Sequence, residues 1–256
     1  MLRGALTQNI DVAQVVLYAF WVFFAGLIFY IRQEDRREGY PLENDKTGKV
    51  GIWGWPFIPD AKTFLLAHGQ GSVSVPNDKR DTRPIKAKKI APFAGAPLEP
   101  TGNPLADGVG PASWAERADR ADLNLHGNPR IVPISSLEGW VVDPHDPDPR
   151  GYRVMGCDRK SAGTISDIWV DTSEHTVRYL EVSVTNGPKV LLPITFTLVN
   201  GDRGHVYVHA LKSTHFAGVP QTKNPAQVTL QEEDKITGYY GGGMLYATRE
   251  RAEPIL

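Results

Sequence analysis

The sequence of 256 residues contains a single cysteine, Cys157, and no strong excess of charge. One cysteine cannot form a disulfide within the chain, which excludes a disulfide-stapled domain and fits a reducing compartment. Lys and Arg together number 28 against 29 Asp and Glu, so the formal net charge is -1. Phosphate backbones require a marked Lys/Arg excess, and nucleic acid is therefore not expected as the main partner.

Recognisable catalytic motifs are also missing. There is no Walker loop, no GxGxxG opening a helix, no HExxH, no CxxC and no GxSxG elbow. The seven histidines are scattered. His205 and His209 are four residues apart in a strand-like run, where solvent-facing histidines are more plausible than a metal pair. We therefore expect a protein that is not an enzyme, with no catalytic, metal-binding or cofactor-binding residues of its own.

The longest apolar run extends from Val12 to Ile31 and contains one polar residue, Gln14, and no charge. A helix of this length spans roughly 30 Å, the thickness of the hydrocarbon core of a bilayer. A buried core helix would show a polar stripe, and a cleavable signal peptide would need a basic start and a small-residue cleavage site. The run ends in the aromatic FYI and is followed directly by RQEDRR. We predict a retained transmembrane helix over 12–31.

The basic residues near this helix are distributed unevenly. Only Arg3 precedes it, whereas several basic residues follow it: Arg32, Arg36, Arg37, Lys46 and Lys49. Cytoplasmic flanks of membrane helices carry the excess of Lys and Arg. The C-terminal side is therefore predicted to be cytoplasmic, which agrees with the lone cysteine.

Residues 32–129 form an extended region that we expect to lie along the surface of a partner. Pro and Gly, which favour turns, are plentiful in the whole chain, at 20 and 25 residues, and predict a loop-rich, largely β soluble part. Residues 32–60 lack a sustained period, and four aromatic residues would hold them on the partner: Tyr40, Trp53, Trp55 and Phe57. A flexible linker is the alternative. Residues 63–76 predict a β-hairpin with a Gly-Gln-Gly turn, 91–111 a Pro/Gly-rich connection, and 112–120 one short helical turn.

Residues 130–256 predict a compact β domain. Six β-rich runs follow one another between turn signals, with Gly163 and Gly187 placed at turns: 131–143, 151–157, 163–171, 177–184, 189–199 and 205–211. Strands at this spacing are typical of a small barrel or a sandwich. Residues 228–248 predict a helix with acidic residues near its start, and Gly241–Gly243 indicate close packing against another element.

Two groups of polar residues could handle protons. Asp171 and Glu174 flank a turn beside His175, and carboxylates close to an imidazole can relay protons. A solvated hairpin turn explains the same residues and is favoured by composition alone. His126 lies in a polar loop downstream of Asp122. His126 can therefore be interpreted either as part of a surface metal or proton site or as an ordinary loop histidine.

Several long strings together resemble one family. They are REGYPLEN after the anchor, DGVGPASW, GCDRKSAGTISDIWVD and VTLQEEDKITGYYGGGMLYA. They are similar to the H subunit of the purple-bacterial photosynthetic reaction centre, over nearly the whole chain. The resemblance implies a single transmembrane α-helix, a mainly-β cytoplasmic domain that is a PRC-barrel-like small β-barrel, and one C-terminal helix. Residues 1–11 would be a short periplasmic N-terminus.

The resemblance implies a subunit without catalysis of its own. Such a subunit caps the cytoplasmic face of the L and M subunits, stabilises the complex and supports proton uptake to the secondary quinone. The partner subunits would hold bacteriochlorophyll, bacteriopheophytin, quinones, non-haem iron and carotenoid. Light-harvesting ring subunits and membrane lipids are further expected neighbours, in the inner (intracytoplasmic) membrane. The alternatives are a membrane-tethered PRC-barrel adaptor for another protein or RNA, and a membrane-bound enzyme.

The resemblance also assigns roles to individual residues. Glu174 and Asp171 match the acidic part of the family's proton pathway, and His126 matches a histidine at its entrance, with Asp122 beside it. The family has an acid and a second histidine where this chain has Asn124 and Asn128, which argues against a metal site there. The expected subunit-interface residues are Tyr40, Glu43, Arg178 and Glu232.

Overall fold

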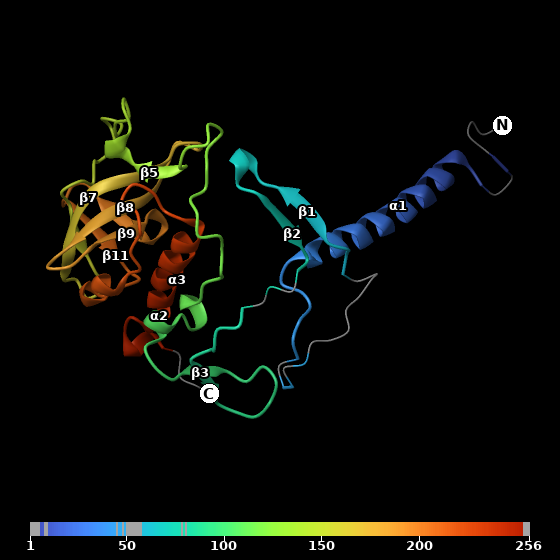
Figure 1. Cartoon of the computed structure of the whole chain (residues 1–256), viewed down its shortest axis with the longest axis horizontal. Helices are drawn as coiled ribbons and strands as arrows, with labels where there is room; N and C mark the ends of the chain where they lie inside the picture. The colour runs from blue at the N-terminus through green and yellow to red at the C-terminus, as the bar shows by residue number, and fades with distance from the viewer. Residues whose placement is uncertain are drawn as a thin grey trace. The chain divides into compact units, whose positions relative to one another are not determined.

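The computed structural model describes residues 6–7, 10–44, 46–47, 49, 58–77, 79 and 81–252 (Figure 1). The chain separates into two compact units, one comprising Met1–Arg80 with Phe93–Gly95 and the other Asp81–Pro92 with Ala96–Leu256. Each unit is considered by itself. The three aromatic residues at 53, 55 and 57 that were expected to hold the extension on a partner lie outside the described residues.

Helix α1 extends from Val12 to Glu34, three residues beyond the predicted end, and one 3-10 turn follows over Asp35–Arg37 (Figure 1). None of the residues of α1 is buried within the chain, and the helix is long and apolar enough to cross a membrane. Gln14 has a local explanation. Its side chain accepts from the Asp11 amide at 3.2 Å while Asp11 accepts from the Gln14 amide at 2.8 Å. This capping box satisfies donors at the helix start.

The predicted hairpin after the helix is confirmed. Strands β1 (Lys62–Leu65) and β2 (Ser72–Val75) pair antiparallel, with Lys62 opposite Val75 and Leu65 opposite Ser72. Arg37 joins the end of α1 to this hairpin. Its guanidinium binds Glu34 at 2.7 Å and donates to the Val75 carbonyl at 3.1 Å and the Asp60 carbonyl at 2.9 Å. The side chain of Leu65, by contrast, is 87% exposed.

The second unit begins with four short elements that the sequence did not predict. Strands β3 (Ala87–Lys89) and β4 (Leu98–Pro100) pair antiparallel. Helix α2 (Pro104–Asp107) and a 3-10 turn (Gly110–Ala112) follow. The helical turn predicted over 112–120 is wrong, because the start and stop signals lie earlier. Asn103 caps α2, Pro104 occupies its first position, and Gly108 ends it at a φ of 65°.

The main sheet has seven strands in the order β10-β11-β6-β7-β8-β9, with β5 paired to β7. Their bounds are β5 Ile131–Pro133, β6 Arg153–Met155, β7 Ser161–Asp171, β8 Thr176–Val184, β9 Lys189–Pro193, β10 Thr197–Asn200 and β11 His205–Val208. The run predicted as one strand over 189–199 is two strands, separated by a 3-10 turn over Ile194–Phe196. Because β9 and β10 are the two ends of the order and only this turn separates them, the sheet curls round (Figure 1).

The core lies under β7 and β8. Ile168, Trp169 and Val170 are consecutive and all buried, so β7 is covered on both faces. Gly163 is inside β7 and not at a turn as predicted. A Cβ there would lie 2.1 Å from the Ser183 carbonyl oxygen, so the close approach of β8 requires glycine.

Helix α3 (Leu230–Tyr246) confirms the predicted C-terminal helix, and Thr229 and Glu232 form its capping box. The predicted close packing of its glycines is also confirmed. A Cβ on Gly242 would lie 2.4 Å from the Ala112 Cβ, and one on Gly243 would lie 2.4 Å from the Ala210 carbonyl oxygen. The 3-10 turn after α2 therefore packs directly on the helix.

Candidate functional site

The site is organised by Arg130, which the sequence interpretation missed. Strand β5 begins one residue later, and its register places Ile131 opposite Asp171 at the end of β7. The Arg130 carbonyl accepts from the Thr172 amide at 2.9 Å and from the Thr172 hydroxyl at 3.0 Å. These contacts fix the Arg130 backbone beside the turn that joins β7 to β8.

The guanidinium of Arg130 meets three carboxylates. Its Nε lies 2.9 Å from Oδ1 and 2.7 Å from Oδ2 of Asp171. One Nη donates to Glu174, and the other lies 3.4 Å from Oδ2 of Asp122. The structure thus brings together three of the four predicted proton-pathway residues. We call Arg130, Asp122, Asp171 and Glu174 the carboxylate cluster.

Within the cluster, Asp171 and Glu174 have different environments. Asp171 is fully buried, and its Oδ1 accepts from the amides of Ser173 at 2.9 Å and Glu174 at 3.1 Å. Burial alone would raise the pKa of Asp171, but the hydrogen bonds from Arg130 and the two amides outweigh it and lower the pKa. The Glu174 side chain, in contrast, is 58% exposed. One carboxylate is therefore a fixed buried anion, and the other faces solvent.

Arg130 itself stays charged. The pKa of Arg130 is raised above its already high value. The hydrogen bond to Asp171 is the largest cause of this rise, the hydrogen bond to Glu174 adds to it, and burial opposes it. The cluster is held together by a cation that does not titrate in the range where proteins work.

The loop that carries His126 is attached to this cluster. The Arg130 amide donates to the Asp122 carbonyl at 2.8 Å, and the Asn124 side chain lies 3.5 Å from the Thr172 hydroxyl. His126 is exposed at the tip of the loop, and its ring makes no hydrogen bond within the described residues.

Local hydrogen bonds join Asn124 and Asn128 within this loop, through the side chain of Asn124 and the backbone of Asn128. The Asn124 side chain accepts from the amides of His126 at 3.0 Å and Asn128 at 3.1 Å. The Asn128 carbonyl in turn accepts from the Asn124 amide at 2.9 Å. Over the described ranges, no group of three or more His, Cys, Asp or Glu side chains is arranged to hold a metal. The absence of a metal site stays a prediction.

Glu233 is a further titratable group, which the sequence interpretation regarded only as one of the acidic residues near the start of the C-terminal helix. The Tyr179 hydroxyl donates to Glu233 at 2.8 Å, and Arg178 lies 3.6 Å away. The Glu233 side chain is only 15% exposed. Burial raises its pKa, the Tyr179 bond and the Arg178 charge oppose the rise, and the nearby Asp122 charge adds to it. The sequence carries one signal that singles out Glu233. The pattern Thr229-x-x-Glu232 is that of a capping box, which uses the Glu232 carboxylate at the start of helix α3 and leaves the carboxylate of Glu233 for another contact.

The expected interface residues occupy varied environments. Tyr40 is half-buried with the Arg36 guanidinium 5.7 Å from its ring centre, and Glu43 is exposed. Arg178 is partly exposed beside Glu233. Glu232 is 5% exposed, and its carboxylate accepts from the amides of Thr229 and Lys223. The interface role of these four residues stays a prediction.

Comparison with known families agrees with the fold. Residues 145–215 match the PRC-barrel domain. This match defines a chain with a PRC-barrel domain, and among the described residues α1 is the one helix long and apolar enough to cross a membrane.

The N-terminal half gives the more specific match. Residues 4–136, over half of the chain, match the photosynthetic reaction centre H-chain N-terminal region. The chain therefore belongs to the photosynthetic reaction-centre H-chain family. Membership gives it the general role of a structural reaction-centre subunit and assigns the cofactors to the other subunits.

Proposed function

We propose that this chain caps the cytoplasmic side of the reaction-centre L and M subunits and supports proton uptake to the secondary quinone. The carboxylate cluster is the observation that carries the proposal. In this cluster the Arg130 guanidinium binds both the buried Asp171 and the exposed Glu174. Contacts from Asp122 and Asn124 connect the cluster to the loop that carries His126. A doubly reduced quinone must take up two protons, while its site must be kept from bulk water, and ionisable groups on a cap meet both needs.

The role of each residue in the proposed proton path follows from its exposure to solvent and from the direction of its pKa shift. His126 and Asp122 would collect protons at the surface. Glu174, the carboxylate of the cluster that solvent reaches most easily, would pass them toward the partner subunit. Asp171, whose pKa is lowered, would remain ionised and act as a positioning anion. Glu233, whose pKa is raised, would be able to hold a proton closer to neutral pH than an ordinary glutamate.

The cap would be held in place by α1 and the β1–β2 hairpin. The basic residues just after α1 support a cytoplasmic position for the C-terminal side, with the N-terminus in the periplasm. The interface residues are then proposed to be Tyr40, Glu43, Arg178 and Glu232. Light-harvesting ring subunits and lipids would surround the helix.

The substitution Glu174→Gln tests the proton role. It removes the titratable group and keeps the shape, so the second, proton-coupled electron transfer to the quinone should slow by roughly tenfold or more. Flash spectroscopy on the purified complex measures that step separately from primary charge separation, which should be unchanged.

Asp148→Asn is the matched control, because Asp148 is a carboxylate paired with Arg150 in the same domain and outside the cluster. It should leave both steps unchanged. Unchanged kinetics of the second electron transfer in the Glu174 variant would refute the proton role of this residue.

A further inference from the structure

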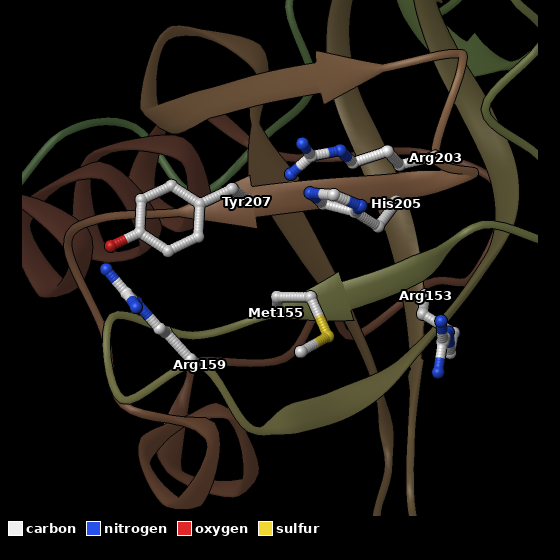
Figure 2. Close-up of a pocket in the computed structure, with 6 residues that line it drawn as sticks. All are labelled: Arg153, Met155, Arg159, Arg203, His205 and Tyr207. Atoms are coloured by element: carbon white, nitrogen blue, oxygen red, sulfur yellow. The ribbon is translucent and has the colours of Figure 1, made fainter.

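The outer face of strands β6 and β11 carries a hollow that the proton path does not use. Its volume is about 570 Å³, within the range of small-molecule sites. Six residues line it, as Figure 2 shows: Arg153, Met155, Arg159, Arg203, His205 and Tyr207.

The strand register explains why these side chains share one face. Strands β6 and β11 are parallel, with Arg153 opposite His205 and Met155 opposite Tyr207. The residues between them, Val154 and Val206, alternate to the other face and are fully buried in the core.

Two more arginines come from the adjoining turns. Arg203 lies in the turn before β11, and Arg159 lies in the turn after β6, where its φ of 58° places it in the left-handed region. The hollow is thus bounded by two turns as well as by the two strands.

The three arginines have no acidic partner in the described part of the chain. Of the two carboxylates next to these arginines in the sequence, Asp158 is held by Ser213 and Asp202 lines a different hollow. Asp158, next to Arg159, accepts from the Ser213 hydroxyl at 2.8 Å and from its amide at 3.2 Å. Asp202, next to Arg203, lines a different hollow with His145. Other arginines of the same domain, such as Arg150, are ion-paired. The hollow therefore gathers positive charge in a chain whose net charge is -1.

The hollow also offers an aromatic and a thioether surface. Tyr207 and Met155 are half-buried, and Figure 2 shows Met155 between an end with Tyr207 and Arg159 and an end with Arg153. Guanidinium groups bind phosphate oxygens through paired donors, and a tyrosine ring stacks on planar rings. The two kinds of surface lie within reach of one small ligand.

We propose that this hollow binds a nucleotide, a small molecule with a planar ring and two or more phosphates. The Tyr207 and Met155 side chains contact the ring, and Arg159 and Arg203 bind the phosphates. Inorganic phosphate alone would leave the apolar surface uncovered. The site is independent of the carboxylate cluster, since they share no residue.

Isothermal titration calorimetry on the purified complex tests the proposal, with ADP, inorganic pyrophosphate and adenosine as probes. ADP should bind more tightly than pyrophosphate, and adenosine should bind weakest. Arg203→Gln and Arg159→Gln should each weaken ADP binding about tenfold, because each removes a charge-assisted contact. Tyr207→Ala should reduce the affinity for ADP to that for pyrophosphate.

Two matched variants separate the site from general effects. Arg150→Gln removes one positive charge from the same domain outside the hollow and should leave ADP binding unchanged. Arg203→Lys keeps the charge and loses the paired donors, so its affinity should fall between those of the native chain and Arg203→Gln.

Three results would overturn the nucleotide assignment. The first is the absence of ADP binding to the native complex. The second is equal affinity for ADP and pyrophosphate. The third is arginine-dependent binding to phosphatidylglycerol vesicles without binding to ADP, which would assign the hollow to lipid headgroups.

Discussion

The two units of the chain differ in where their apolar side chains lie. No described residue before position 81 is buried, although α1 and the hairpin are rich in large apolar side chains. The second unit buries Trp169, Tyr240 and Phe216 almost completely. Burial of apolar surface is the main favourable term in folding. The second unit can therefore be stabilised by its own core, whereas the first depends on surroundings such as lipid or other subunits.

The largest expected effect compares a core leucine with a hairpin leucine. Leu192 is fully buried and Leu65 is 87% exposed. Leu192→Ala should lower the free energy of unfolding of the chain by about 2–5 kcal/mol, since it removes buried methyl groups and leaves a cavity. Leu65→Ala should change it by less than about 0.5 kcal/mol. Denaturant unfolding of the full chain in detergent measures both. Equal losses would show that the hairpin is part of a folded core.

Arg130→Gln tests whether the carboxylate cluster belongs to the internally stabilised unit. The variant leaves the buried Asp171 without its cation, and breaking a buried pair costs about 3–5 kcal/mol. Because two backbone amides still hold Asp171, the lower end of that range is expected. Denaturant unfolding measures the loss, and a change below about 0.5 kcal/mol, as for an ordinary surface site, would contradict the account.

The same variant has a predicted pH signature. The folded-state pKa of Asp171 lies below its ordinary value, so its stabilisation is present above about pH 4 and is lost as the pH falls through the folded value. Without Arg130, the Asp171 pKa rises and this loss becomes smaller. Acid titrations of unfolding free energy should therefore converge for the native chain and the variant at low pH. If the two curves of unfolding free energy against pH stay parallel, Arg130 is not the cause of the lowered Asp171 pKa.

A smaller effect compares glycines in the two long helices. A Cβ on Gly242 of α3 would meet the Ala112 Cβ at 2.4 Å, whereas Gly26 of α1 has nothing within 4 Å. Gly242→Ala should destabilise the chain by about 1–3 kcal/mol through overpacking. Gly26→Ala should leave stability unchanged or slightly improved, because alanine favours the helix. Thermal unfolding in detergent checks both variants, and a neutral Gly242→Ala would show that the helix can shift away from Ala112.

The sequence predicted those features that depend on local pattern. The apolar run defined α1, turn signals defined the hairpin, and Asp171 and Glu174 were placed on the β7–β8 turn. Local chemistry was sufficient in these cases. The capping box that Gln14 forms with Asp11 was not predicted, although the spacing of these two residues is itself a local pattern.

Other features that the sequence did not predict depend on contacts between distant residues. Arg130 becomes part of the site only because β5 pairs with β7, which brings it to Asp171, 41 positions away in the sequence. Gly163 carries no local mark that separates a turn from a tightly packed strand. Glu233 acquires its raised pKa from burial beside Tyr179 and from Asp122, which lie on other elements. Register and burial are properties of the fold, and a single sequence does not display them.

The most direct test of the account is whether the first unit requires partner subunits. The chain is purified from its own membranes in mild detergent, and the near-infrared absorption of bacteriochlorophyll is recorded. The native chain should bring L, M and their pigments with it. Leu65→Asp on the hairpin should reduce the pigment recovered, while Leu198→Asp, at an exposed leucine of the second unit, should not. A colourless native preparation, or equal losses in the two variants, would contradict the account.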